Sequence, residues 1–211
     1  MIPAFPKIFH VGEKYISKLF DGPVEITEKV DGSQFVFGKM NGELFCRSKG
    51  KILVLESLEK MFSVAVDYIV SNQDKLEDDT IYFAEYLRKP KHNVLCYLDT
   101  PRNHLALFGV MKKDKTLINY HKDLGQFADN IGVDVVPLIH WGEIKKPEDI
   151  FSMVEKESFL GGVHMEGLVV KNYAQEFMLG GQVFPLMSGK YVTEKFKEKH
   201  RTDWKKENTG S

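Results

Sequence analysis

The stretch from Glu25 to Gly50, EITEKVDGSQFVFGKMNGELFCRSKG, has the pattern of a charged strand followed by a β-hairpin. Apolar residues recur with a period of two around Phe35 and Phe37, and the alternation resumes at Leu44. Between them, Asn41-Gly42 supplies a two-residue turn of the kind that tolerates positive φ. The sequence therefore predicts two paired antiparallel strands, and this hairpin fixes where the preceding charged residues can point.

Three charged residues and a glycine interrupt the apolar pattern just before the hairpin. Lys29 lies between Glu28 and Asp31, and Gly32 follows. On an extended segment Lys29 and Asp31 share one face, and Gly32 predicts a bend where the backbone turns sharply or comes close to a ligand. Two interpretations remain open at this point: a charged edge strand that resists aggregation, or a lysine placed for chemistry beside a bend.

Composition limits the kind of protein. The chain has 211 residues, of which 43% are hydrophobic and 28% charged, with a net charge of −1. This length predicts a single domain over residues 1–211 with a substantial core. Balanced charge excludes a uniformly basic nucleic-acid coat, so any basic site must be local.

Cysteine usage and hydropathy suggest a compartment. Cys46 and Cys96 are too few for a disulfide framework, and no Cys-x-x-Cys zinc spacing occurs. There is no signal-peptide pattern and no apolar run of membrane length. We therefore expect a cytoplasmic protein without a membrane partner, and the lack of a periodic apolar seam favours a monomer.

The remaining periodicity alternates between helical and extended segments. It predicts helices at 53–70, 123–131, 147–156 and 194–208, and strands at 80–87, 104–111, 133–141, 166–173 and 188–192. Residues 115–120 are expected to pair with the strand at 104–111. Many short strands joined by hairpins, with helices at intervals, indicate an α+β fold with largely antiparallel sheets.

Polar residues within these apolar strands need a reason, because buried strand positions seldom carry unpartnered charge. They are Lys29, Asp31, Glu85, Glu166, Lys171 and Lys190, with Arg47 and Lys49 where the hairpin ends. Taken singly, each fits a strand end that faces solvent. Taken together, they form a set of lysines and carboxylates on separate strands, as a pocket for a phosphorylated ligand requires.

The order of these segments resembles the covalent nucleotidyltransferase superfamily of ATP-dependent ligases and mRNA capping enzymes. EKVDG is similar to its nucleophile motif, and RSKG, FAEYL, the base-stacking strand LALFGV, EGLVVK and GKYVTEKF follow in the family's order. FPKI, PRNHLALFGV and KYVTEKFKEKH most resemble RNA-repair ligases of phage type. The resemblance implies an ATP-grasp-like nucleotidyltransferase (ligase adenylation) fold of two largely antiparallel sheets with flanking helices, and ATP between the sheets.

The resemblance also implies roles for individual residues. It implies catalytic roles for three lysines. Lys29 would become lysyl-AMP, and Lys171 and Lys190 would contact the phosphates. Nucleotide-binding roles pass to Glu28 at the adenine edge, Asp31, Gly32, Arg47 and Glu85 at the ribose, Lys49, Phe108 stacked on the base, and Glu166. Asp31 and Glu166 would organise Mg²⁺ or Mn²⁺. Phe108 also fits a simple core position, and Lys49 a solvated one.

The chemistry explains a lysine placed among carboxylates and other lysines. An amine attacks the α-phosphorus of ATP only when neutral, and at a reference pKa of about 10.4 deprotonation at pH 7 costs roughly 4 to 5 kcal/mol. Neighbouring positive charge lowers that cost, whereas carboxylates alone would raise it.

Two positions depart from the family pattern. Val192 stands where a second lysine of the fifth motif is common, and Gly109 where many relatives have an acidic residue.

The expected function is an ATP-dependent RNA ligase that joins a 5′-phosphate to a 3′-hydroxyl of RNA. Two alternatives stay open: a DNA ligase or capping-type guanylyltransferase, and a nucleic-acid end-binding module without catalysis. Only about twenty residues follow Lys190, which predicts no OB-fold domain. The segment 194–208 is expected to be a basic helix, either solvated or bound to RNA phosphates.

Overall fold

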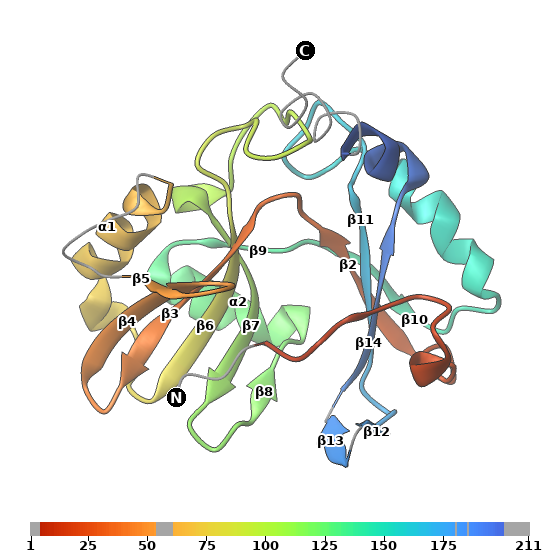
Figure 1. Ribbon diagram of the computed structural model, residues 1–211, viewed down its shortest axis with the longest axis horizontal. Coiled ribbons are helices and arrows are strands. Elements are labelled where there is room, and N and C mark those ends of the chain that lie inside the picture. The colour runs from red at the N-terminus through yellow and green to blue at the C-terminus, as the bar shows by residue number, and fades with distance from the viewer. Residues whose placement is uncertain (1–4, 54–60, 180, 185, 201–211) are drawn as a thin grey trace. The chain divides into compact units, whose positions relative to one another are not determined.

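A computed structural model of the protein describes residues 5–53, 61–179, 181–184 and 186–200 (Figure 1). The chain divides into two compact units. The first unit comprises Met1–Phe5, Gly32–His92 and Leu98–Val136, and the second comprises Pro6–Asp31, Asn93–Tyr97 and Pro137–Ser211. Each unit is built around its own sheet.

The first unit contains a seven-stranded sheet in the order β5-β4-β3-β6-β7-β8, with β9 paired to β7. The strands are β3 Ser33–Met40, β4 Glu43–Ser48, β5 Ile52–Leu53, β6 Thr80–Tyr86, β7 Leu105–Lys112, β8 Leu117–Ile118 and β9 Asp134–Val135. All pairs are antiparallel except β7 with β9. The predicted hairpin is confirmed, since Met40 pairs with Glu43 and the turn residues Asn41 and Gly42 have φ of 53° and 81°.

Both α-helices of the first unit pack on one face of this sheet (Figure 1). They are α1 Ser63–Ser71 and α2 His121–Ile131, accompanied by the short 3₁₀ helices η2 Gln73–Lys75 and η3 Arg102–His104. Their apolar residues share a core with aromatic side chains of β3 and β6, among them Phe35, Phe37 and Tyr82. As predicted, α2 ends at Gly132, whose φ of 74° is the left-handed conformation that favours glycine.

The second unit contains a five-stranded sheet in the order β1-β14-β11-β2-β10. The strands are β1 Phe9–His10, β2 Val24–Lys29, β10 Leu138–Gly142, β11 Gly167–Asn172 and β14 Met187–Val192. Only β1 and β14 pair in parallel. The 3₁₀ helix η4, Pro147–Glu155, contributes Ile150 and Val154 to the core on one face of the sheet. A 3₁₀ turn η1, Lys14–Ile16, and a small hairpin of β12 Phe177–Leu179 and β13 Gln182–Phe184 complete the unit.

The α+β fold with two largely antiparallel sheets is confirmed, but several element boundaries differ. The strand predicted at 133–141 is divided at Pro137 into β9 in the first unit and β10 in the second. Proline has no N–H to continue a ladder, and the carbonyl of Pro137 instead accepts a hydrogen bond from the backbone N–H of Glu28 at 3.1 Å.

One predicted helix is also corrected. Leu53 lies in β5, opposite Cys46, and the helix begins at Ser63; residues 54–60 of the predicted helix lie outside the described residues. The helix predicted at 147–156 is confirmed as the 3₁₀ helix η4. The C-terminal helix is present over 194–200, and its predicted remainder, 201–208, lies outside the described residues. Among the helices that are described, none is long and apolar enough to span a membrane.

Candidate functional site

The three central strands of the second unit bring the predicted lysines to one face of the sheet. Val24, Ile26, Leu168 and Val170 belong to the core on the other face, so the residues that alternate with them point away from it. The strand register gives three rows: Lys29 opposite Gly167 and then Val192, Thr27 opposite Val169 and then Lys190, and Glu25 opposite Lys171 and then Ser188. We call the surface that carries Lys29, Lys171 and Lys190 the lysine face.

Lys29 ends β2 and is paired with a buried carboxylate. Its Nζ lies 2.6 Å from Oε1 of Glu166, and the side chains are 28% and 5% exposed. The backbone carbonyl of Glu166 accepts a hydrogen bond from the N–H of Thr193 at 3.0 Å, which fixes the carboxylate at the start of β11. Lys29 is therefore accessible while its partner is not.

Burial dominates the electrostatics of Glu166. It raises the pKa of the Glu166 carboxyl to about 7, although the charge of Lys29 opposes the shift. Oε2 of Glu166 is buried and has no hydrogen-bond partner among the described residues. A carboxyl group with such a pKa exchanges a proton readily near neutral pH, and its second oxygen remains available to a proton, a water molecule or a cation.

Asp31 anchors a loop. Its Oδ2 accepts hydrogen bonds from the backbone N–H groups of Val94 at 2.8 Å and Leu95 at 2.7 Å, and its own N–H donates to the hydroxyl of Tyr97 at 2.9 Å. No group of three metal-ligating side chains occurs within the described part of the chain. Of the two carboxylates predicted to organise a metal, Glu166 thus has a buried oxygen without a partner among the described residues, and Asp31 uses its Oδ2 to hold residues 93–97.

Glu28 points away from the lysine face. Its carboxylate accepts hydrogen bonds from the hydroxyl of Ser158 and from the N–H of Phe159 at 3.1 Å. Burial raises the pKa of the Glu28 carboxyl, and these two bonds oppose the shift. The side chain predicted to read the adenine edge is thus engaged with the loop that precedes β11.

Lys171 forms a buried ion pair that the sequence did not indicate. Its Nζ lies 3.1 Å from Oε1 of Glu25, both residues are 3% exposed or less, and the Tyr173 hydroxyl also donates to Oε1 at 3.1 Å. Burial lowers the pKa of Lys171, and Glu25 opposes that shift. Glu25 could have been found from its register, since it stands four residues before Lys29 on the same strand face.

Lys190 is half-buried and has a histidine beside it. His10 of β1 pairs directly with Lys190 in the parallel register, so both side chains lie on the lysine face. Burial, and then the charge of Lys190, lower the pKa of His10, with smaller contributions from Lys197 and Lys29. The sequence pattern did not reveal His10, because a two-residue parallel strand leaves no periodic signal.

The first unit brings Arg47, Glu85 and Phe108 to one face of its sheet, the face without helices. Val36 pairs with Arg47 on one side and Phe83 on the other, and Glu85 lies one row away. The register of β6 and β7 shifts between Phe83 and Ala84. Such a bulge redirects side chains, and here Phe108 is left half-buried against this face.

Local contacts account for the other predicted residues of the first unit. The predicted bend at Gly32 is confirmed, and a Cβ on Gly32 would lie 2.7 Å from the carbonyl oxygen of Tyr86. The N–H of Gly32 donates to Glu85 at 3.0 Å. Arg47 bonds the carbonyl of Lys49 at 3.4 Å, and Lys49 itself is exposed.

Gly109, the second departure from the family pattern, accommodates an aromatic ring. A Cβ there would lie 2.7 Å from the ring of Phe5. Phe5 also contacts Phe108 edge to face, with ring centroids 5.0 Å apart. An acidic side chain at position 109 would therefore displace the ring that supports Phe108.

Comparison of this structure with solved structures finds RNA ligases of similar fold. An RNA ligase of Naegleria gruberi with pyrophosphate superposes with a TM-score of 0.68 at 20% identity, covering 95% of this chain and 58% of that chain. A mutant of the same enzyme with ATP and manganese gives a TM-score of 0.68 at 19% identity with the same coverage. These likenesses show a shared fold, and the chain spans just over half the length of those enzymes.

One curated protein matches this chain by sequence, and its name describes a different activity. A phosphoribosyl imidazole-4-carboxamide isomerase of Bacillus cereus is 26% identical over 147 residues, which is 69% of this chain and 54% of the isomerase. That identity is too low to carry an activity across. The family model described as RNA ligase, by contrast, matches residues 22–192, a range that contains every predicted site residue and all strands of the two sheets except β1, so the chain belongs to the RNA ligase family.

Proposed function

We propose that this protein is an ATP-dependent RNA ligase that forms a covalent lysyl-AMP on Lys29, passes AMP to a 5′-phosphate RNA end and seals that end to a 3′-hydroxyl. The observation that carries the proposal is the accessible Lys29 amine, 2.6 Å from buried Glu166 on a face with two further lysines. Membership in the RNA ligase family and the likeness to an RNA ligase with ATP and manganese support it.

In the first step the neutral Lys29 amine attacks the α-phosphorus of ATP. A P–N bond forms, the bond to pyrophosphate breaks, and the lysine proton passes to Oε1 of Glu166. The raised pKa of Glu166, about 7, suits a carboxylate that accepts and later releases this proton. Nucleophile and acceptor are already within hydrogen-bond distance.

The next two steps return the lysine to its starting state. The 5′-phosphate of RNA attacks lysyl-AMP, so the P–N bond breaks and an RNA-adenylate forms. The 3′-hydroxyl then attacks that 5′-phosphate, forming the phosphodiester bond and releasing AMP. Positive charge near the phosphates stabilises each transition state. We assign that part mainly to Lys190, because Glu25 already neutralises buried Lys171.

The remaining nucleotide contacts are proposed from the family resemblance. Arg47 and Glu85 bind the ribose hydroxyls, Phe108 stacks on the base, and Lys49 adds positive charge. Gly32 permits the close approach of the backbone at the bend. The shared orientation of Arg47, Glu85 and Phe108 on the helix-free face of the first unit supports these roles.

Among the described residues, Oε2 of Glu166 is a candidate ligand for a divalent cation. It is a buried oxygen without a partner there, and carboxylate oxygen is a preferred ligand type of Mg²⁺ and Mn²⁺. We propose that the ion stays largely hydrated, as is usual for Mg²⁺. When bound, such an ion neutralises phosphate charge. The phage-type motifs further suggest a monomeric RNA-repair enzyme of the cytoplasm.

Intact mass spectrometry tests the proposal. The protein is incubated with Mg²⁺ or Mn²⁺ and either ATP or GTP, and the mass is read before and after addition of 5′-phosphorylated RNA. We expect an AMP adduct that RNA discharges. A GMP adduct would identify a capping-type guanylyltransferase, and discharge by DNA but not RNA would identify a DNA ligase. Absence of any adduct would leave a nucleic-acid end-binding module.

A further inference from the structure

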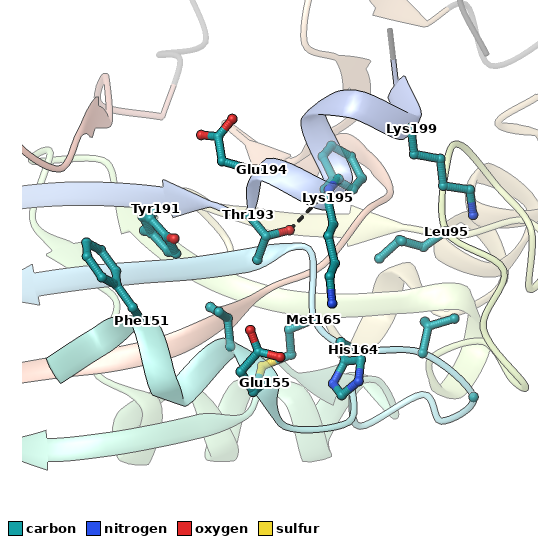
Figure 2. Close-up of a pocket in the computed structure, with 14 residues that line it drawn as sticks. Leu95, Phe151, Glu155, His164, Met165, Tyr191, Thr193, Glu194, Lys195 and Lys199 are labelled. Carbon is teal, nitrogen blue, oxygen red and sulfur yellow. Dashed lines mark hydrogen bonds between the residues drawn. The ribbon is translucent and has the colours of Figure 1, made fainter. Parts of the chain in front are cut away.

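A cavity lies in the second unit, and none of the predicted site residues lines it. It has a volume of about 550 Å³ and is enclosed by η4, residues 162–165, the end of β14 and the helical residues 194–200 (Figure 2). Its floor is formed by Val154, Met165 and Leu95, which are 3%, 2% and 8% exposed. This volume is in the range of small-ligand sites in proteins.

Aromatic rings form one wall of the cavity. Phe151 and Tyr191 pack together with ring centroids 4.8 Å apart, and Phe151 is still 45% exposed. Figure 2 shows the two rings side by side at one end of the cavity. Phe196 lines it from the helical segment. A planar ring of a ligand can thus stack on an exposed aromatic surface that leads to a buried apolar floor.

The rim of the cavity carries two lysines from the helical segment. Lys195 and Lys199 line the cavity one helical turn apart, and neither has an ion pair with any residue that the structure describes. In Figure 2 the amine of Lys195 extends toward Glu155 and His164. Glu194 also lines the cavity, but it is paired at 2.7 Å with Lys197, which does not.

The cavity is built from the same segments that hold the carboxylates beside Lys29. Met165 directly precedes Glu166, and the N–H of Thr193 donates to the carbonyl of Glu166 at 3.0 Å. Leu95 donates its N–H to Asp31 at 2.7 Å. A ligand bound in the cavity therefore touches the neighbours of both carboxylates.

We propose that this cavity binds one nucleotide of the RNA strand, an inference that rests on the proposed ligase function. Lys195 and Lys199 bind a backbone phosphate, and the base stacks on Phe151 and packs against the apolar floor. Glu155 lies on the opposite side of the cavity from the helical segment and accepts a hydrogen bond from a ribose 2′-hydroxyl (Figure 2). A carboxylate would repel a second phosphate but suits a hydroxyl donor, which is the group that distinguishes RNA from DNA.

Matched variants of the full-length chain test each part of this binding mode. Lys195→Ala/Lys199→Ala is compared with Lys197→Ala, which removes a cation from the same helix outside the cavity. Phe151→Ala is compared with Phe159→Ala, another exposed aromatic residue that does not line the cavity. Binding of a fluorescent 5′-phosphorylated oligoribonucleotide and of its DNA counterpart is measured by anisotropy over a range of salt concentrations.

We expect the double lysine variant to bind RNA about tenfold more weakly, with a salt slope smaller by about 0.7 for each phosphate that the protein no longer neutralises. Phe151→Ala should weaken binding by about five- to tenfold because the base no longer stacks, and Glu155→Gln should reduce the preference for RNA over DNA. The two control variants should bind as wild type does. Equal losses in cavity and control variants, or no loss in any, would overturn the inference.

Adenylylation separates this inference from the proposed function. Every variant should form the AMP adduct on Lys29 as wild type does, because the cavity does not hold ATP. If wild type forms the adduct and the cavity variants bind RNA normally, the cavity inference alone is wrong. If wild type forms no adduct, the ligase proposal is wrong, whatever the RNA affinities show.

Discussion

Replacing Glu166 by glutamine removes the titration of a carboxyl group that is 4% exposed and bonded to Lys29. Burial raises its pKa from 4.5 to about 7 in the folded protein. Each pKa unit corresponds to about 1.36 kcal/mol, so the difference between the folded and unfolded states is of order 3 kcal/mol. This is a large part of the stability of an ordinary domain.

The sign follows from proton binding. Between pH 4.5 and pH 7 the folded protein holds a proton on Glu166 that the unfolded chain has released, so the free energy of unfolding falls as pH rises. The stabilisation is present in full below pH 4.5 and is lost as pH passes through 7. The glutamine side chain of the variant does not titrate. From about pH 4 to about pH 8, Glu166→Gln should therefore gain about 3 kcal/mol in unfolding free energy relative to wild type.

Urea denaturation at a series of pH values measures this difference. The matched control is Glu176→Gln, which changes an exposed carboxylate in the same unit and should leave the pH dependence as in wild type. If the stability curves of Glu166→Gln and wild type run parallel over this pH range, Glu166 is not held protonated by burial. Its assignment as a proton acceptor tuned near neutral pH would then fail as well.

Other substitutions test the rest of the lysine face. Lys29→Ala and Lys29→Arg should both lose the AMP adduct in intact mass spectra, because arginine stays protonated; an adduct in either variant would refute the nucleophile. Glu25→Ala should lower the urea-derived unfolding free energy by about 3–5 kcal/mol by leaving Lys171 buried without its partner, and Glu25→Ala/Lys171→Met should lose less. Lys190→Ala should slow single-turnover adenylylation by roughly 100-fold or more, whereas Val192→Lys should match or exceed the wild-type rate.

The fold was predictable where a local signal and a long-range contact agree. The hairpin after Lys29 is specified by its own turn, Asn41-Gly42, and the strands at 80–87 and 104–111 by continuous apolar runs. The prediction of a single strand at 133–141 was wrong because its two halves pair with strands of different sheets. Only Pro137 marks the division between them. Apolar residues before a helix, such as Leu53, fit a strand and a helix equally well.

For the candidate site, the gathering of several predicted residues could be anticipated, whereas their side-chain contacts could not. The motifs predict lysines delivered by separate strands, and the structure places Lys29, Lys171 and Lys190 on one face. They do not indicate what each side chain bonds. Ser158 satisfies the buried carboxylate of Glu28 from a distant position, and such a partner leaves no periodic or motif signal in one sequence.

Chain length does not discriminate among the classes of ligase. Few residues follow Lys190, and this argues against a DNA ligase or a capping enzyme only if RNA ligases lack a further domain after the fifth motif. The matched RNA ligase structures are longer than this chain, which covers 58% of them. Additional sequence beyond the matched part therefore does not separate RNA ligases from DNA ligases or capping enzymes, and the nucleotide and polynucleotide specificities have to be measured.

The register of the lysine face accounts for the unusual fifth motif. Gly167 lies between Lys29 and Val192 in one row, and a Cβ there would come within 1.9 Å of the Tyr191 carbonyl. Position 192 thus faces Lys29 across two strand spacings, about 10 Å, with no side chain between them. Lys190 lies one row further, at about 12 Å, within reach of a triphosphate bound at Lys29 as proposed. Under that proposal Lys190 can serve the phosphates alone, and a second lysine at 192 would add positive charge nearer Lys29 without displacing any side chain in that row.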